Sequence, residues 1–138
     1  MRNILVSAIL LIVLNIFFTK SGYSQFQKPV VGALIEYEDF ATSTVENVPC
    51  DFFKEAFAGT IRRVDIKDRV DLKRLAGYAN EFKMVKPKPI DVRVLLTICY
   101  SETKEEYCMD RWGLFVNKWT AKYYSNKRLA DYILKRCR

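Results

Sequence analysis

The sequence predicts a small α+β domain, built mainly from an antiparallel sheet with two or three helices and held by disulfide bonds. The middle of the chain alternates apolar and polar residues with a period of two, which is typical of half-buried strands. Segments after Asp51, Asp68 and Asn126 carry apolar residues at helical spacing, each behind a residue suited to capping. Separate helices around a strand-rich middle favour α+β over a parallel α/β arrangement.

The first 24 residues have the pattern of a secretory signal peptide. Arg2 precedes an apolar run over residues 4–18, and small and polar residues follow up to Ser24. The run is shorter than the roughly 20 residues of a membrane-spanning helix, so an uncleaved anchor is the less favoured alternative. We expect cleavage near Ser24, export to the periplasm or the exterior, and a single mature domain over residues 25–138.

The mature domain is moderately basic. Without Arg2 and Lys20, 21 of the 23 Lys and Arg residues remain against 16 Asp and Glu, a net charge of +5. An exported protein rarely meets nucleic acid, so we exclude that partner and expect another protein, an anionic lipid or an anionic glycan. A charge that serves only solubility is the simplest alternative.

The first half of the mature domain predicts two strands and two helices. The expected elements are a strand over 30–40, a helix over 51–58, a strand over 60–67 and a helix from Asp68 to between Gly77 and Asn80. Asp51 and Asp68 suit the helix starts, and Gly59 suits a helix stop. Residues 51–58 also alternate, so a strand is the alternative there. The second helix carries an apolar stripe that begins at Val70.

The second half predicts three strands and a final helix. The expected elements are a strand from Ile90 to Cys99, a return strand over 107–116, a short strand over 119–124 and a helix over 127–137. Pro87 and Pro89 end the preceding helical region. Asn126 can cap the final helix, and the basic residues near its end suit the negative pole of the helix dipole.

Four cysteines in an exported chain favour disulfide bonds. They are Cys50, Cys99, Cys108 and Cys137. If the chain turns within SETKEE, Cys99 faces Cys108 and Thr97 faces Asp110 across the hairpin, within disulfide reach. The remaining pair is then Cys50 with Cys137, although four cysteines permit three connectivities. The close pairs typical of zinc sites and the C-x-x-C of redox sites are absent from the sequence.

The chain contains no histidine, which excludes Ser-His-Asp and Cys-His nucleophilic sites and histidine metal sites. We therefore expect neither a metal nor a cofactor and no enzymatic activity. A remote alternative is a glycan hydrolase that uses Glu36 and Glu38, which share one strand face about 7 Å apart. The favoured interpretation is that these carboxylates lie at a solvated strand end.

Two further groups are candidate binding sites. Asp110 and Arg111 beside Trp112 could hold a ligand carboxylate or a sugar, although a cross-strand charge pair next to a core Trp is simpler. The C-terminal quarter interleaves cations with aromatic rings, a combination suited to glycans, anionic headgroups or protein hot spots. Its members are Lys118, Trp119, Lys122, Tyr123, Tyr124, Lys127 and Arg128. An amphipathic strand with its aromatic side in the core is the alternative.

These features favour a small exported binding protein over an enzyme. Its most specific form is an inhibitor or immunity-type protein that acts on an envelope or secreted protein. The alternative function is a basic-aromatic module that binds anionic lipid or polysaccharide. The two hypotheses differ in salt dependence, because exposed charges are screened beyond roughly 8–10 Å at physiological ionic strength.

Overall fold

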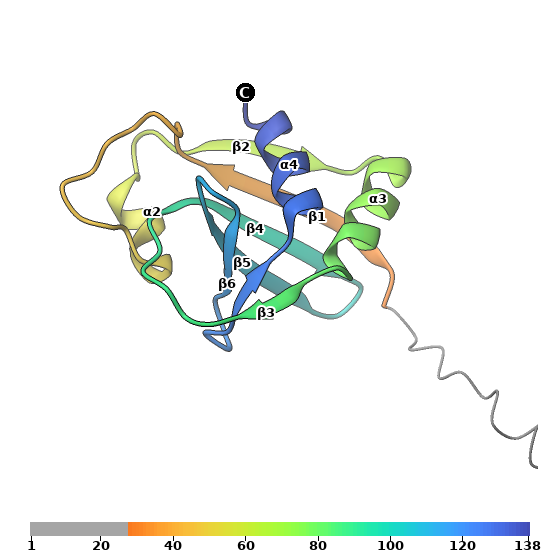
Figure 1. Ribbon diagram of the computed structural model, residues 1–138. Coiled ribbons are helices and arrows are strands. Elements are labelled where there is room, and N and C mark those ends of the chain that lie inside the picture. Colours follow the sequence, from red (N-terminus) through yellow and green to blue (C-terminus); the bar gives the residue numbers. More distant parts are fainter. Residues whose placement is uncertain (1–27) are drawn as a thin grey trace, which may run out of the picture.

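Seven strands form one sheet at the centre of the structure (Figure 1). The computed structural model describes residues 28–138, and the predicted signal peptide, residues 1–24, lies outside this range. The elements are β1 (Val30–Tyr37), the 3-10 helix η1 (Cys50–Phe52), α2 (Phe53–Ala56), β2 (Arg62–Ile66), α3 (Arg69–Ala79), β3 (Lys83–Val85), β4 (Val92–Tyr100), β5 (Lys104–Asp110), β6 (Leu114–Asn117), β7 (Tyr123–Ser125) and α4 (Lys127–Arg136). The strand order is β2-β1-β4-β5-β6-β7-β3, with every neighbouring pair antiparallel. The predicted α+β class is confirmed, with the sheet as the dominant part.

Both faces of the sheet are covered at its centre. Leu96 of β4 belongs to the core cluster that includes Leu75 of α3 and Ile133 of α4. Leu95, the residue before it, belongs to a second cluster on the other face, which includes Phe53 of α2. The prediction that this strand is half-buried is therefore wrong, because its alternating residues fill two cores instead of one core and a solvated face.

The disulfide bond joins Cys50 to Cys108, so the predicted pairs Cys99–Cys108 and Cys50–Cys137 are wrong. The hairpin between β4 and β5 turns earlier than expected and places Leu95, not Cys99, opposite Cys108. Cys108 then faces the second core, where the start of η1 brings Cys50 to a Cα–Cα distance of 5.7 Å. Cys99, half-buried, and Cys137, buried, are free thiols.

Side-chain caps begin the two longer helices, as predicted. Asp68 accepts hydrogen bonds from two backbone N–H groups in the first turn of α3, and Asn126 accepts one in α4. The Asn126 amide also donates to the Tyr78 carbonyl at 2.7 Å, which ties α4 to the end of α3. Asp51 makes no capping hydrogen bond, because it lies within η1. Val70, expected on the buried stripe of α3, is exposed.

A turn replaces most of the strand predicted over residues 119–124. The Asn117 side chain accepts hydrogen bonds from the backbone N–H groups of Trp119 and Thr120, and Ala121 has a positive φ of 53°. The chain is extended again only in β7, which pairs with β6 on one side and with β3 on the other. The sequence analysis did not predict β3, a strand of three residues.

Candidate functional site

The predicted aromatic-basic recognition set does not lie on one strand face. Its members lie in the turn between β6 and β7 (Lys118, Trp119, Lys122), in β7 (Tyr123, Tyr124) and in the first turn of α4 (Lys127, Arg128). Tyr124 packs inward, with its ring 5.3 Å from that of Phe82. Trp119 is exposed, and the Lys118 ammonium lies 5.8 Å from the centre of its ring. Among the described cation–ring contacts, Lys118 with Trp119 lies within the set, whereas Arg128 lies over Tyr78, outside it.

The predicted pair of Asp110 and Arg111 is also absent, since the two side chains have different partners. Asp110 Oδ1 accepts hydrogen bonds from the backbone N–H groups of Trp112 and Leu114, each at 2.9 Å, and so holds the turn between β5 and β6. Arg111 reaches the carboxylate of Asp91 instead, with Nη2 3.5 Å from Oδ2. Trp112, expected in the core, is exposed, with the Arg111 guanidinium 5.4 Å from the ring centre.

Glu36 and Glu38 are both buried, in contrast to the solvated strand end that the sequence favoured. Glu36 is paired with Lys54 at 2.8 Å and with Arg63 at 3.1 Å. Glu38 accepts hydrogen bonds from the hydroxyls of Thr42 and Thr60.

The pKa of Glu38 lies below its usual value. Burial acts in the opposite direction and raises this pKa, but the hydrogen bonds from Thr60, Thr42 and the Asp39 backbone outweigh it. A general acid in glycan hydrolysis needs a raised pKa. The contacts of Glu38 are therefore more consistent with a structural role at the base of the following loop than with a role as general acid.

Residues 39–49, which make up nearly all of the segment between β1 and η1, project beyond the end of the sheet that lies away from α3 (Figure 1). We call these residues the braced loop. On its outgoing side, the Ala41 N–H donates to Asp39 Oδ1 at 2.8 Å. On its return side, the Val48 N–H donates to Asp91 Oδ1 at 3.1 Å, and the Val48 carbonyl accepts from the Val92 N–H at 2.9 Å. The first bond stabilises the turn at the start of the loop, and the other two fix the return leg to the body of the domain.

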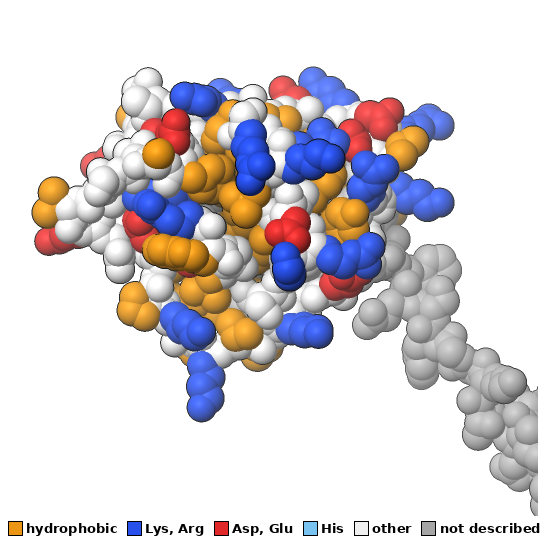
Figure 2. Space-filling view, turned by 45° about the horizontal axis from the view of Figure 1, so that its top comes forward, with side chains coloured by type: hydrophobic (Ala, Val, Ile, Leu, Met, Phe, Trp, Pro, Cys, Tyr) orange, Lys and Arg blue, Asp and Glu red, His pale blue; other side chains and the backbone are white. Residues whose placement is uncertain are grey.

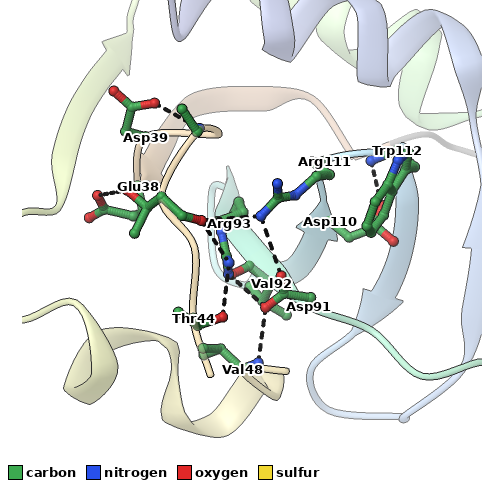
Figure 3. A network of polar contacts seen from close by, with 12 residues as sticks. Glu38, Asp39, Thr44, Val48, Asp91, Val92, Arg93, Asp110, Arg111 and Trp112 are labelled. Atoms are coloured by element: carbon green, nitrogen blue, oxygen red, sulfur yellow. Dashed lines mark hydrogen bonds and ion pairs between the residues drawn. The ribbon is translucent and has the colours of Figure 1, made fainter. Parts of the chain in front are cut away.

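Arg93 is fully buried beneath the braced loop and provides its main support. Its Nη2 donates to the Thr42 carbonyl at 3.2 Å and to Thr44 Oγ1 at 3.1 Å, while Nη1 donates to Asp91 Oδ1 at 2.7 Å (Figure 3). Hydrogen bonds to charged groups contribute about 1.5–3 kcal/mol each. The guanidinium also lies 5.2 Å from the centre of the Phe57 ring. One side chain thus links the loop to β4 and to the helical segment on that face.

A β-bulge lies in β4 beside the start of the loop. The pairing of β4 with β5 shifts between Val92 and Val94, which leaves Arg93 as the extra residue. Bulges bend a strand locally and are frequent next to functional sites. The Arg93 carbonyl accepts from the Glu38 N–H at 2.9 Å, so the bulge is also joined to the start of the loop.

Arg111 supports the same loop from the turn after β5. Its Nη2 donates to the Thr42 carbonyl at 3.2 Å, the same oxygen that Arg93 uses, and it shares Asp91 with Arg93 (Figure 3). Two guanidinium groups therefore converge on one carboxylate and one loop carbonyl. Because Trp112 follows Arg111 directly, its exposed ring is held at this end of the domain.

The tip of the braced loop is left open to solvent. Val45 is fully exposed, and Glu46 and Asn47 are exposed beside it. Among the described hydrogen bonds, none involves these three residues. Immediately after the return leg, Cys50 is anchored to β5 by the disulfide bond. The result is a short free tip on a base that is fixed by arginine, carboxylate and disulfide contacts.

Neither Arg93 nor the braced loop was predicted from the sequence. The available signal was a charged residue within an otherwise apolar strand, since Arg93 stands among Val92, Val94, Leu95 and Leu96. A buried arginine must be hydrogen-bonded, so its position alone indicated a polar partner on that face of the sheet. Sequence could not identify this partner as a loop some 50 positions earlier.

The chain is thus a small disulfide-bonded α+β domain whose exposed loop is fixed at its base. Within residues 28–138, no helix is both long enough and apolar enough to cross a membrane. In the same part of the chain, no group of three or more His, Cys, Asp or Glu side chains is placed to hold a metal ion. Comparison with known proteins found no matching family model, curated protein or solved structure.

Proposed function

We propose that this chain is an exported, non-enzymatic binding protein that inserts the tip of the braced loop into a cleft of another envelope or secreted protein. An inhibitor or immunity-type protein is the specific form of this proposal. The observation that carries it is the fully buried Arg93, whose hydrogen bonds hold an exposed loop from beneath. A buried charge is costly unless it is paired. Here the groups that pair with Arg93 belong to the loop, while the tip of the loop makes no described hydrogen bond of its own.

A braced loop suits binding because it is ordered before the partner arrives. Association otherwise includes the free-energy cost of ordering loop and side chains, which a preorganised loop avoids in part. Val45 supplies a compact apolar group at the tip, and Glu46 supplies an adjacent charge. Trp112, exposed at the same end of the sheet, belongs to the residue types enriched in binding hot spots. The expected partner surface is therefore a cleft with an apolar pocket.

Site-directed crosslinking tests this proposal. The oxidised protein would carry a photo-crosslinking side chain at position 45 and would be exposed to envelope and secreted fractions of its own organism in high salt. We expect one protein to be crosslinked through its cleft and to lose activity at one-to-one stoichiometry. Val45→Asp should weaken this binding at least tenfold, since it places a charge in the apolar pocket.

The matched control is Val31→Asp, which changes another exposed valine at the opposite end of β1. It should change the affinity less than twofold. The proposal fails if the partner binds Val45→Asp as tightly as the unmodified chain, or if Val31→Asp weakens binding equally. It also fails if position 45 crosslinks no protein from either fraction.

A further inference from the structure

A groove between α3 and α4 gathers positive charge on the helical side of the domain. Its volume is about 520 Å³. Four cations line it, against the single carboxylate of Asp131: Arg74, Arg128, Lys135 and Arg136. Figure 2 shows Lys and Arg side chains predominating around this region, with apolar surface between them. The groove lies on the opposite face of the sheet from α2, and its residues take no part in the braced loop.

Three of the four cations that line the groove make ion pairs: Arg74, Arg128 and Arg136. Asp71 binds two of them, Arg136 at 2.6 Å and Arg74 at 3.3 Å, through different carboxylate oxygens. The Arg136 guanidinium also lies 4.6 Å from the centre of the Tyr132 ring. Each guanidinium has five N–H donors, and these contacts use only some of them. Since one carboxylate holds two guanidinium groups, a positive charge remains unbalanced at this point.

The floor of the groove is aromatic. Tyr78 and Tyr132 meet edge to face with ring centroids 5.7 Å apart, and Arg128 lies 4.9 Å from the Tyr78 centroid while bound to Glu81 at 2.6 Å. Because the two guanidinium groups cover these rings, the rings are not free to stack on a sugar. The Tyr132 hydroxyl is buried and makes no hydrogen bond to the described residues. Among the side chains that line the groove, it is the one buried polar atom without a hydrogen-bond partner in the described residues.

We propose that this groove is an oxyanion site for a phosphate or sulfate ester. Arginine forks bind such groups through two parallel N–H···O bonds, and groups that are already positioned lose less entropy on binding. Asp71 and Glu81 pair with three of the four cations, so with Asp131 counted one positive charge remains uncompensated, and the two neighbouring guanidinium forks at Asp71 suit the several oxygens of a tetrahedral oxyanion. This site is independent of the proposed loop–partner interaction. Of the aromatic-basic set predicted from the sequence, it includes Arg128.

Titration of the oxidised chain with inorganic phosphate and sulfate, followed by backbone amide NMR at constant ionic strength, tests the site. We expect saturable shifts at the facing turns of α3 and α4. Arg136→Gln and Arg74→Gln should each weaken binding at least fivefold. Lys86→Gln, which removes one charge from an exposed loop outside the groove, should change it less than twofold. Thermal unfolding of each variant verifies that the fold is retained.

The ester source is resolved by three further probes: phenyl phosphate, a sulfated oligosaccharide, and vesicles containing phosphatidic acid. Saturable binding of any of them that competes with inorganic phosphate supports the site and identifies the source. The proposal is overturned if shifts never saturate, if acetate binds as tightly as phosphate, or if Lys86→Gln weakens binding as much as Arg136→Gln. Vesicle binding without any response to inorganic phosphate also overturns it.

Discussion

Replacing Cys50 and Cys108 together by alanine removes the covalent link between the return leg of the braced loop and β5. The bond closes a loop with a sequence separation of 58 residues. In the chain-entropy model, opening a loop of this length returns about 14 cal/mol/K to the unfolded chain, or about 4 kcal/mol at 25 °C. The free energy of unfolding should fall by this amount. With a urea slope of about 1.5 kcal/mol/M, the unfolding midpoint should fall by roughly 2–3 M.

Urea unfolding, followed by tryptophan fluorescence, measures this change, and Cys99→Ser provides the control. Cys99 is a half-buried free thiol, so its replacement should alter the free energy of unfolding by only about 0.5 kcal/mol. Peptide mapping after alkylation of the unfolded, unreduced protein should find label on Cys99 and Cys137 only. Label on Cys50, or a Cys99→Ser variant as unstable as the double variant, would refute the observed strand register.

Three other predictions follow from single residues. Gly113→Ala should destabilise the fold by about 2 kcal/mol or more in urea unfolding, because the glycine has a φ of 84° and an added Cβ would lie 2.8 Å from the Ala130 Cβ; an unchanged midpoint would contradict this. The pKa of Glu38 is lowered from 4.5, so its ionised carboxylate stabilises the fold above pH 4.5, and this stabilisation is lost as the pH falls through the pKa of the folded state. Below pH 4.5 the urea midpoint of the unmodified chain should therefore drop more steeply than that of Glu38→Gln, and parallel pH profiles would exclude this role. Burial raises the pKa of Cys137 to about 12, so iodoacetamide at pH 8 should label Cys99 well before Cys137 in the native protein, and equal labelling rates would contradict the burial of Cys137.

Features that depend on a few consecutive residues were predicted well. Asp68 and Asn126 begin their helices as expected, because a cap bonds to N–H groups only two or three residues away. The extended runs of β1, β2 and β4 also followed from local alternation. The strand predicted over residues 119–124 is shorter than expected, because the Asn117 side chain holds a turn there.

The pattern of apolar and polar residues did not determine how β4 and β5 are paired. In the hairpin between β4 and β5 the return strand already begins at Lys104. The polar residues 104–106, which were predicted to belong to the turn, make contacts within the sheet. Glu105 accepts hydrogen bonds from the hydroxyls of Tyr100 and Tyr107, and Lys104 pairs with Glu106 at 3.1 Å. A different turn changes every cross-strand partner. That shift placed Cys108 opposite Leu95 and so changed the disulfide bond.

The α+β class, the absence of histidine chemistry and the start of each long helix could be predicted, since they depend on composition or on neighbours along the chain. The pairing of the cysteines, the burial of both faces of β4 and the support of a loop some 50 positions earlier by Arg93 became known only from the folded chain. Each of these depends on which distant segments meet in space. A buried guanidinium requires hydrogen-bond partners wherever it lies, but only the folded chain specifies which groups they are.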